Sequence, residues 1–138
     1  MNATDTSESA PHFAVAGAVI DALASQDFAR LEAALDVDAA MTALVPKGLR
    51  ECHGPAEICA MFETWFGDFD EYAVADASVG AVGDLLQMRW RLRVKGARFD
   101  GEPMIVEQHA YATTGPSGRI GRISLLCSGF WPEHGDAA

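Results

Sequence analysis

Three side chains that can carry or stabilise a proton alternate along one segment of the chain: Glu107, His109 and Tyr111. The segment 104–114 has the alternation of a β-strand, so these side chains share a face, with bases roughly 7 Å apart. A carboxylate and an imidazole at that separation can exchange a proton or hold one substrate between them. Apolar surroundings favour the protonated acid and the neutral imidazole, the states that acid–base catalysis near neutral pH requires.

Tyr111 and Cys127 extend this group of candidate residues. The phenol of Tyr111 could donate a hydrogen bond to a developing enolate oxygen, and Cys127, on the following strand, is a candidate contact. Each residue has a structural alternative. His109 would be a satisfied core or interface residue, Tyr111 an ordinary core aromatic and Cys127 a small buried hydrophobe. A nucleophilic pair of Cys127 and His109 lacks a supporting local motif.

The predicted helices occupy the first half of the chain. Apolar residues recur with helical spacing in three segments, 12–25, 28–35 and 55–66. Asp27 is placed to cap the second helix, and Pro55 suits the first turn of the third. The intervening stretch 41–50 contains Pro46 and Gly48 and is interpreted as an irregular or extended link.

The second half has the period of two that is typical of β-strands. Strands are expected over 69–79, 86–95, 104–114 and 119–130. The apolar row from Leu86 to Leu92 must face the core, because its alternates are polar. The basic alternates Arg89, Arg91, Arg93 and Lys95 are assigned to a solvated face or to a dimer interface paired with acidic neighbours. On the last strand, the less polar row is placed inside: Gly121, Ile123, Leu125 and Cys127. Helices followed by antiparallel strands indicate the α+β class.

Composition narrows the classes of partner. The chain has 138 residues and a formal charge of −10, which fits one domain and argues against nucleic acid or an anionic membrane as partner. No apolar run approaches the roughly 20 residues of a membrane span. The three cysteines have no metal-ligand spacing and are interpreted as free thiols, so a cytoplasmic location is expected.

The ends of the chain are polar and are assigned no role in the fold. Residues 1–11 are expected to be a disordered lead-in, because they have neither the basic nor the apolar part of a signal peptide. Residues 12–132 are expected to form the single domain, and residues 133–138 a flexible tail.

Four short segments resemble proteins of the nuclear transport factor 2-like superfamily, in particular its SnoaL-like branch. They are Ala24–Phe28, His53–Ile58, Met88–Leu92 and Gly118–Ile120. The resemblance covers residues 12–132, and the order and spacing of the segments are specific for the superfamily. They do not specify an activity, because members of this fold include polyketide cyclases, ketosteroid isomerase and non-catalytic binding domains.

The resemblance implies a cone-shaped, cystatin-like roll. Three N-terminal helices would pack on a curved, mostly antiparallel sheet around one apolar pocket, and homodimers would form through the sheet's outer face. The resemblance also favours the row of Glu107, His109 and Tyr111 facing the pocket. Composition alone leaves that orientation open, because the alternate row with Val106 and Ala110 could pack equally well.

Under this interpretation, the pocket would hold an apolar small molecule and would need no metal or cofactor. The expected substrate-binding residues are Trp90, Met88, Phe62, Trp65, Leu125 and Cys127. The predicted activity is that of a cofactor-free isomerase, cyclase or dehydratase acting on an apolar ketone or polyketide-like substrate. His109 would transfer the proton, Glu107 would assist it and Tyr111 would hold the oxygen. The alternative is a non-catalytic ligand-binding or dimerising domain of the same fold.

The known catalytic sets of the superfamily do not transfer whole. The acid on the last strand of SnoaL-like cyclases corresponds to a position near Leu125, and the tyrosine and first aspartate of ketosteroid isomerase fall near Val19 and Ala43. The Asp-Arg-Asp trio of limonene-type epoxide hydrolases has no inward-facing counterpart. Asp27 could stand for the first-helix aspartate of scytalone dehydratase, although a helix cap explains it as well. Only His109 corresponds to a catalytic position in any of them.

Overall fold

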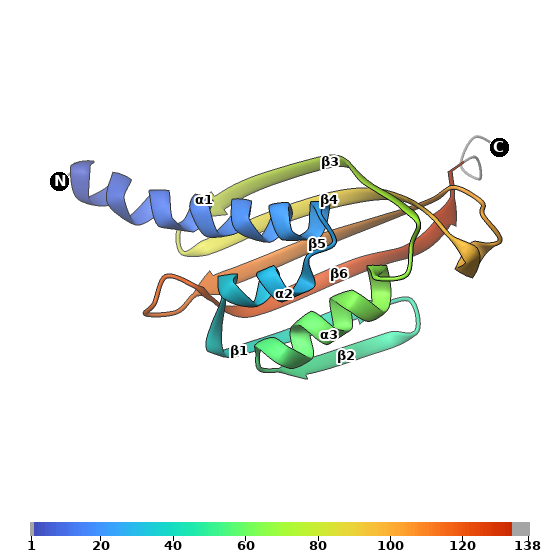
Figure 1. The fold of residues 1–138 in the computed structure, drawn as a ribbon. Helices are drawn as coiled ribbons and strands as arrows, with labels where there is room; N and C mark the ends of the chain where they lie inside the picture. The colour runs from blue at the N-terminus through green and yellow to red at the C-terminus, as the bar shows by residue number, and fades with distance from the viewer. Residues whose placement is uncertain (1, 134–138) are drawn as a thin grey trace.

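The computed structural model describes residues 2–133, in which three helices lie on one face of a six-stranded sheet (Figure 1). The helical elements are α1 (Asn2–Ala24), α2 (Phe28–Leu31), the 3-10 turn η1 (Glu32–Ala34), α3 (Pro55–Phe66) and the 3-10 turn η2 (Ala97–Phe99). The strands are β1 (Leu35–Val45), β2 (Gly48–His53), β3 (Glu71–Val82), β4 (Leu85–Lys95), β5 (Met104–Thr114) and β6 (Ile120–Pro132).

The strands are ordered β2-β1-β6-β5-β4-β3 across the sheet. β1 and β6 are parallel, and every other neighbouring pair is antiparallel. The predicted α+β class with a mostly antiparallel sheet is therefore confirmed. The sheet continues from the hairpin β3–β4 through β5 and β6, so β5 and β6 lie at its centre.

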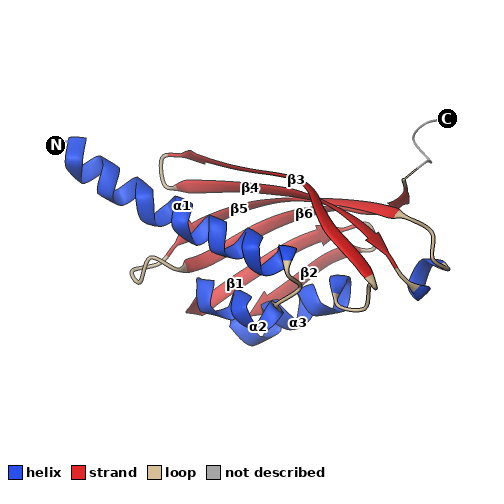
Figure 2. Cartoon of the chain, turned by 45° about the horizontal axis from the view of Figure 1, so that its top comes forward, coloured by secondary structure: helices blue, strands red, loops and turns tan. Residues whose placement is uncertain are grey.

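The helices cover different parts of one sheet face (Figure 2). α1 packs over β3 and β4, whereas α3 packs over β1 and β2. Asp27 caps α2 by accepting a hydrogen bond from the backbone N–H of Arg30 (3.1 Å), as predicted. Pro55 begins α3, also as predicted, and Gln26 ties the end of α1 to the end of α3 by donating to the carbonyl of Phe66.

Residues 41–50, expected to be an irregular or extended link, are extended but form paired strands of the sheet. These residues belong to the hairpin β1–β2, in which Met41 pairs with Cys52 and Leu44 with Leu49. Pro46 and Lys47 form the turn of this hairpin, and Gly48 is the first residue of β2, where it pairs with Val45. β1 was missed because its Asp and Ala residues have low strand propensity. Pairing with β6 and packing under α3 override that propensity.

The first helix begins earlier in the chain than its apolar spacing indicated. α1 begins at Asn2, well before residue 12, where the apolar spacing starts. At the other end, Glu133 lies in a turn, and the remainder of the expected flexible tail lies outside the described residues. None of the described helices combines the length and the apolar character needed to cross a membrane.

One apolar core lies between the helices and the sheet. Its largest fully buried side chains include Trp90, Phe62 and Phe66. The Phe62 ring lies 6.3 Å from that of Trp90 and 5.2 Å from that of Trp65, where it makes an edge-on contact. The contact between Phe62 and Trp90 joins α3 to β4.

Candidate functional site

The register between β4 and β5 decides which face each candidate residue occupies. Directly paired residues of an antiparallel ladder share a face. The buried Trp90 pairs with Gln108, whereas Arg91 pairs with Glu107 and Arg89 with His109. The expectation that Glu107, His109 and Tyr111 face the helices is therefore wrong. These residues lie on the outer face of the sheet, and Tyr111 is 43% exposed.

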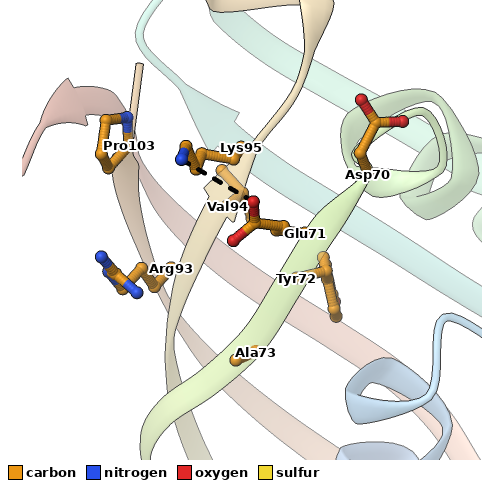
Figure 3. A pocket seen from close by; sticks show the side chains of 8 residues that line it. All are labelled: Asp70, Glu71, Tyr72, Ala73, Arg93, Val94, Lys95 and Pro103. Carbon is orange, nitrogen blue, oxygen red and sulfur yellow. Dashed lines mark ion pairs between the residues drawn. The ribbon is translucent and has the colours of Figure 1, made fainter. Parts of the chain in front are cut away.

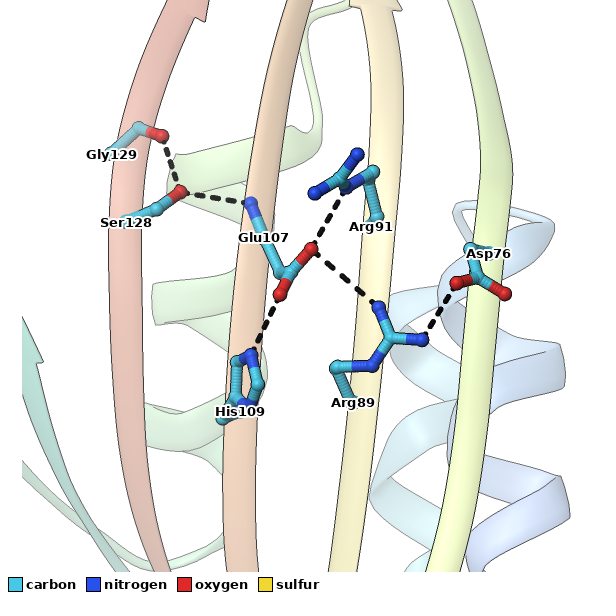
Figure 4. A network of polar contacts seen from close by, with 7 residues as sticks. All are labelled: Asp76, Arg89, Arg91, Glu107, His109, Ser128 and Gly129. Atoms are coloured by element: carbon cyan, nitrogen blue, oxygen red, sulfur yellow. Dashed lines mark hydrogen bonds and ion pairs between the residues drawn. The ribbon is translucent and has the colours of Figure 1, made fainter.

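The physical reason is the charge pattern of the outer face (Figure 4). Glu107 accepts a 2.8 Å hydrogen bond from Nε of Arg91 and lies 3.5 Å from Arg89. Arg89 also contacts Asp76 on β3 at 2.6 Å. If Glu107 faced the core, its charge would be buried without these basic partners. Burial of an unpaired charge is energetically unfavourable.

His109 adds a further contact to this network. Its Nε2 lies 2.7 Å from Oε2 of Glu107, and the ring donates, because an ionised carboxylate only accepts. The backbone N–H of Glu107 donates to Ser128 on β6, so the residue is also held from the other side (Figure 4). Glu107 thus links β5 to β4 through its carboxylate and to β6 through its backbone N–H.

The electrostatic consequence is a stabilised anion at Glu107. Partial burial opposes its ionisation, but hydrogen bonds from His109 and Arg91, with the charges of Arg91 and Arg89, outweigh that effect and lower the pKa of Glu107. The hydrogen bond and charge of Arg89 likewise lower the pKa of Asp76. A carboxylate stabilised in this way is a weak general base.

The other basic residues of β4 are also paired with acidic residues. The sequence had led us to expect acidic neighbours for this basic row. Arg93 contacts Glu133 at 2.9 Å, and Lys95 lies 3.7 Å from Glu71. This second pair borders a shallow surface pocket at the ends of β3 and β4, with Tyr72 and Val94 among its lining residues (Figure 3). The basic row is thus neutralised within the sheet and is not a free anion-binding surface.

The predicted substrate-binding residues lie on the inner side of the fold. Trp90, Met88, Phe62 and Leu125 are almost fully buried, and Trp65 and Cys127 are partly buried against the same core. The inward row predicted for β6 is confirmed, because Leu125 pairs with Ala110 and Cys127 with Gln108. Their binding role stays a prediction.

Sequence reasoning missed Gln108. Among the described residues, it is the only polar or charged residue that is buried, and its exposed fraction is 0%. Its Oε1 accepts a 2.9 Å hydrogen bond from the indole Nε1 of Trp90. One signal could have identified Gln108 as an inward residue. The indole N–H of a buried Trp90 needs an acceptor, and Gln108 is the residue that pairs with Trp90 across the β4–β5 ladder.

A β-bulge in β6 adjoins Gln108. The ladder between β5 and β6 shifts between the pairs Val106–Phe130 and Gln108–Cys127. Gly129 in the bulge has φ +77, and a Cβ there would lie 2.5 Å from the Pro46 side chain, so the position requires glycine.

The sequence profile of the SnoaL-like domain matches residues 16–123, which include α3, the whole of β4 and β5, and Gln108. The chain belongs to the SnoaL-like family. A search of curated proteins by sequence found no match.

Solved structures similar to this SnoaL-like domain support the same fold. A candidate polyketide cyclase from Xanthomonas campestris pv. campestris has a TM-score of 0.70 at 15% identity, over 86% of this chain and 91% of the other. An M. tuberculosis LEH-like epoxide hydrolase has a TM-score of 0.61 at 16% identity, over 86% and 84%. A protein of ketosteroid isomerase-like fold from Catenulispora acidiphila, solved with trimethylamine, has a TM-score of 0.66 at 14% identity, over 83% and 85%. At these identities, the likeness concerns the fold alone.

Two further features of the SnoaL-like domain bear on its chemistry. Within residues 2–133, no group of three or more His, Cys, Asp or Glu side chains is arranged to hold a metal ion. The inward rows of β4 and β5 carry apolar residues apart from Gln108, which does not titrate. The inward rows of these two strands therefore present no titratable side chain to the helices.

Proposed function

We propose that this SnoaL-like domain binds a neutral, largely apolar small molecule between its helices and the inner face of the sheet. The observation that carries the proposal is the β4–β5 register, which places the uncharged Gln108 inside and Glu107 and His109 outside. Apolar walls with few polar groups are typical of small-molecule sites. Membership of the SnoaL-like family supports this class of ligand, as do the structural neighbours, which include a candidate polyketide cyclase and an LEH-like epoxide hydrolase.

The residues proposed to line the site are those that the sequence singled out. Trp90, Met88, Phe62 and Leu125 supply the buried walls, and the partly buried Trp65 and Cys127 supply the side nearer to solvent. Trp65 belongs to α3 and Cys127 to β6, so ligand entry between these elements would leave the sheet intact.

The acid–base enzyme predicted from the sequence is the weaker candidate. Its three groups, Glu107, His109 and Tyr111, share the outer face, and the guanidinium groups beside Glu107 reduce its basicity. A substrate held on the inner face would be separated from these groups by the sheet. Substitution of His109 by Ala is therefore expected to leave ligand binding unchanged.

Titration with 2-acetonaphthone, followed by amide NMR shifts, tests the binding proposal. We expect saturable binding and shifts at inward-facing residues such as Leu125. Leu125→Phe narrows the inner face and should weaken binding about tenfold. Leu126→Phe, one residue on but facing outward, should not. Circular dichroism would verify that both variants fold. Absence of saturable binding, or shifts confined to the outer face, would contradict the proposal.

We also propose a homodimer through the outer face. Leu44, Leu49 and Leu126 are each about half exposed there, and they form one row across β1, β2 and β6. They line a shallow groove together with Tyr111, next to the charge network around Glu107. An exposed apolar groove beside a fully paired charged region is typical of a protein–protein interface.

A further inference from the structure

The connection between β4 and β5, residues 96–103, forms a compact turn around η2 at the end of the sheet nearest the C-terminus (Figure 1). Four backbone hydrogen bonds hold this turn together, and all four join residues between Gly96 and Glu102. The chain reverses at Asp100 and Gly101, whose φ angles are +56 and +78. The turn is therefore a self-contained unit that can move as one body.

Arg98 fastens this turn to the end of α3. Its guanidinium donates to the backbone carbonyls of Thr64 and Trp65, each at 3.0 Å, and to the carboxylate of Asp68 at 2.6 Å. Carbonyls in the last turn of a helix have no partner within the helix, so a cationic donor is favourable there. One side chain of the turn thus caps a helix that lies more than thirty residues earlier in the chain.

Aromatic rings attach the same turn to β6. The ring of Phe99 stacks on that of Phe69 at 6.1 Å and lies 5.1 Å from that of Phe130. The guanidinium carbon of Arg98 lies 5.4 Å from the centre of the Phe130 ring, within the range of a cation–π contact. Phe130 belongs to β6 and meets α3 through Phe66 at 6.3 Å. The turn therefore spans the boundary between α3 and β6.

This boundary is where the proposed site approaches the solvent. Trp65 on α3 and Cys127 on β6 are partly buried, whereas Phe62 and Trp90 are only 2% and 1% exposed. A ligand can reach Phe62 and Trp90 only when an element moves aside. Displacing α3 or a strand would break regular backbone hydrogen bonding and core packing. Displacing the turn breaks the contacts of two side chains, so local opening there has the lower free energy.

We propose that residues 96–103 are a strap that closes the entrance between α3 and β6, and that Arg98 is its fastening. The inference rests on the proposed function, in which the ligand enters between these two elements. The strap opens when the guanidinium leaves the carbonyls of Thr64 and Trp65 and the Phe99 ring leaves Phe130. Because the strap makes no contact with the bound ligand, it changes the rates of entry and exit together and leaves the affinity unchanged.

Arg98→Ala tests the strap in the protein without ligand. Amide hydrogen exchange over residues 97–102 should accelerate at least about tenfold, because losing hydrogen bonds to a charged group changes the open population by that factor. Iodoacetamide should modify Cys127 faster by a similar factor, whereas the buried Cys52 on β2 should react as in the wild type. Mass spectrometry of peptides locates both changes.

Two control variants separate opening of the strap from other effects. Arg93→Ala removes another arginine near the end of β4, one that pairs with Glu133, and should alter neither measurement. Leu31→Ala removes a fully buried side chain from α2 and lowers overall stability. Its effect on hydrogen exchange should be spread over the chain rather than concentrated in residues 97–102.

The kinetics of 2-acetonaphthone binding test the role of the strap as an entrance. In Arg98→Ala, the association and dissociation rates should both rise at least about tenfold, with little change in the dissociation constant. Wild-type exchange and Cys127 reactivity in Arg98→Ala, or the same pattern in Leu31→Ala, would overturn the inference and leave the proposed function intact. If 2-acetonaphthone does not bind the wild-type protein, the proposed function fails, and the role of the strap as an entrance fails with it.

Discussion

Nε2 of His109 lies 2.7 Å from Oε2 of Glu107, and both side chains lie on the sheet face opposite the helices. In sequence, this pair had the spacing of an acid–base site. In the fold, it is one contact of a network that also includes Arg89, Arg91 and Asp76 (Figure 4). We expect the contact between His109 and Glu107 to stabilise the outer face of the sheet.

Glu107→Gln should lower the free energy of unfolding by about 1 kcal/mol at neutral pH, the upper range for an exposed ion pair. Because the pKa of Glu107 is lowered from 4.5 by folding, its stabilisation is present above about pH 4.5 and is lost as pH falls through the lower folded value. Urea unfolding at pH 7, 4.5 and 3 should therefore show a difference that shrinks with acidification. Glu71→Gln, at a 68% exposed side chain, is the control and should change little. A constant difference at all three pH values would contradict this account.

Leu126→Asp should convert the proposed dimer to monomer at micromolar concentration, because it places a charge in the centre of the apolar groove. Light scattering coupled to gel filtration measures the mass. Val82→Asp is the control, since Val82 is 80% exposed but pairs with Leu85 at the tip of the β3–β4 hairpin. A wild-type protein that is already monomeric at this concentration would refute the proposed interface.

Trp90→Phe should destabilise the protein by about 2 kcal/mol or more, because it removes buried ring volume and the donor to Gln108. Combining it with Gln108→Met makes a double-mutant cycle. We expect a coupling energy of about 1 kcal/mol from guanidinium unfolding curves. Strict additivity would mean that the 2.9 Å hydrogen bond contributes nothing to stability.

Tyr72→Phe should leave the free energy of unfolding unchanged or raise it by up to about 1 kcal/mol. Burial raises the pKa of the Tyr72 phenol, and its hydroxyl has no partner among the described residues, so its removal relieves an unsatisfied group. Thermal unfolding measures the effect. A clear loss of stability would show that the hydroxyl has a partner when the protein is in solution.

Arg98→Ala should lower stability by about 2 kcal/mol. The guanidinium donates to the carbonyls of Thr64 and Trp65 at the end of α3 and lies 4.7 Å from the ring centroid of Phe69. Arg98→Lys is the informative comparison, because an ammonium group cannot make the same set of contacts at once. Chemical denaturation should place Arg98→Lys closer to Arg98→Ala than to the wild type, and full rescue by lysine would contradict this role.

Much of the fold follows from local sequence signals. The amphipathic period and Pro55 predicted α3, and strict alternation predicted β4 and β5 within a residue of their observed bounds. The alternation also fixed the inward row of β4, because no other face could bury Trp90. β1 was missed, since its strand character depends on a parallel partner, β6, about eighty residues away in sequence.

The sequence by itself determined the family, the helices and most strands, and a row of basic residues that needs acidic partners. Only the tertiary structure decided which row of β5 faces the helices. The connection between β4 and β5 contains η2, and a register shift of one residue there would exchange Glu107 and His109 for Gln108 on the inner face. Both rows of β5 alternate correctly, so periodicity cannot distinguish them. The choice depends on long-range pairing, in which Arg89 and Arg91 meet Glu107 outside while Trp90 meets Gln108 inside.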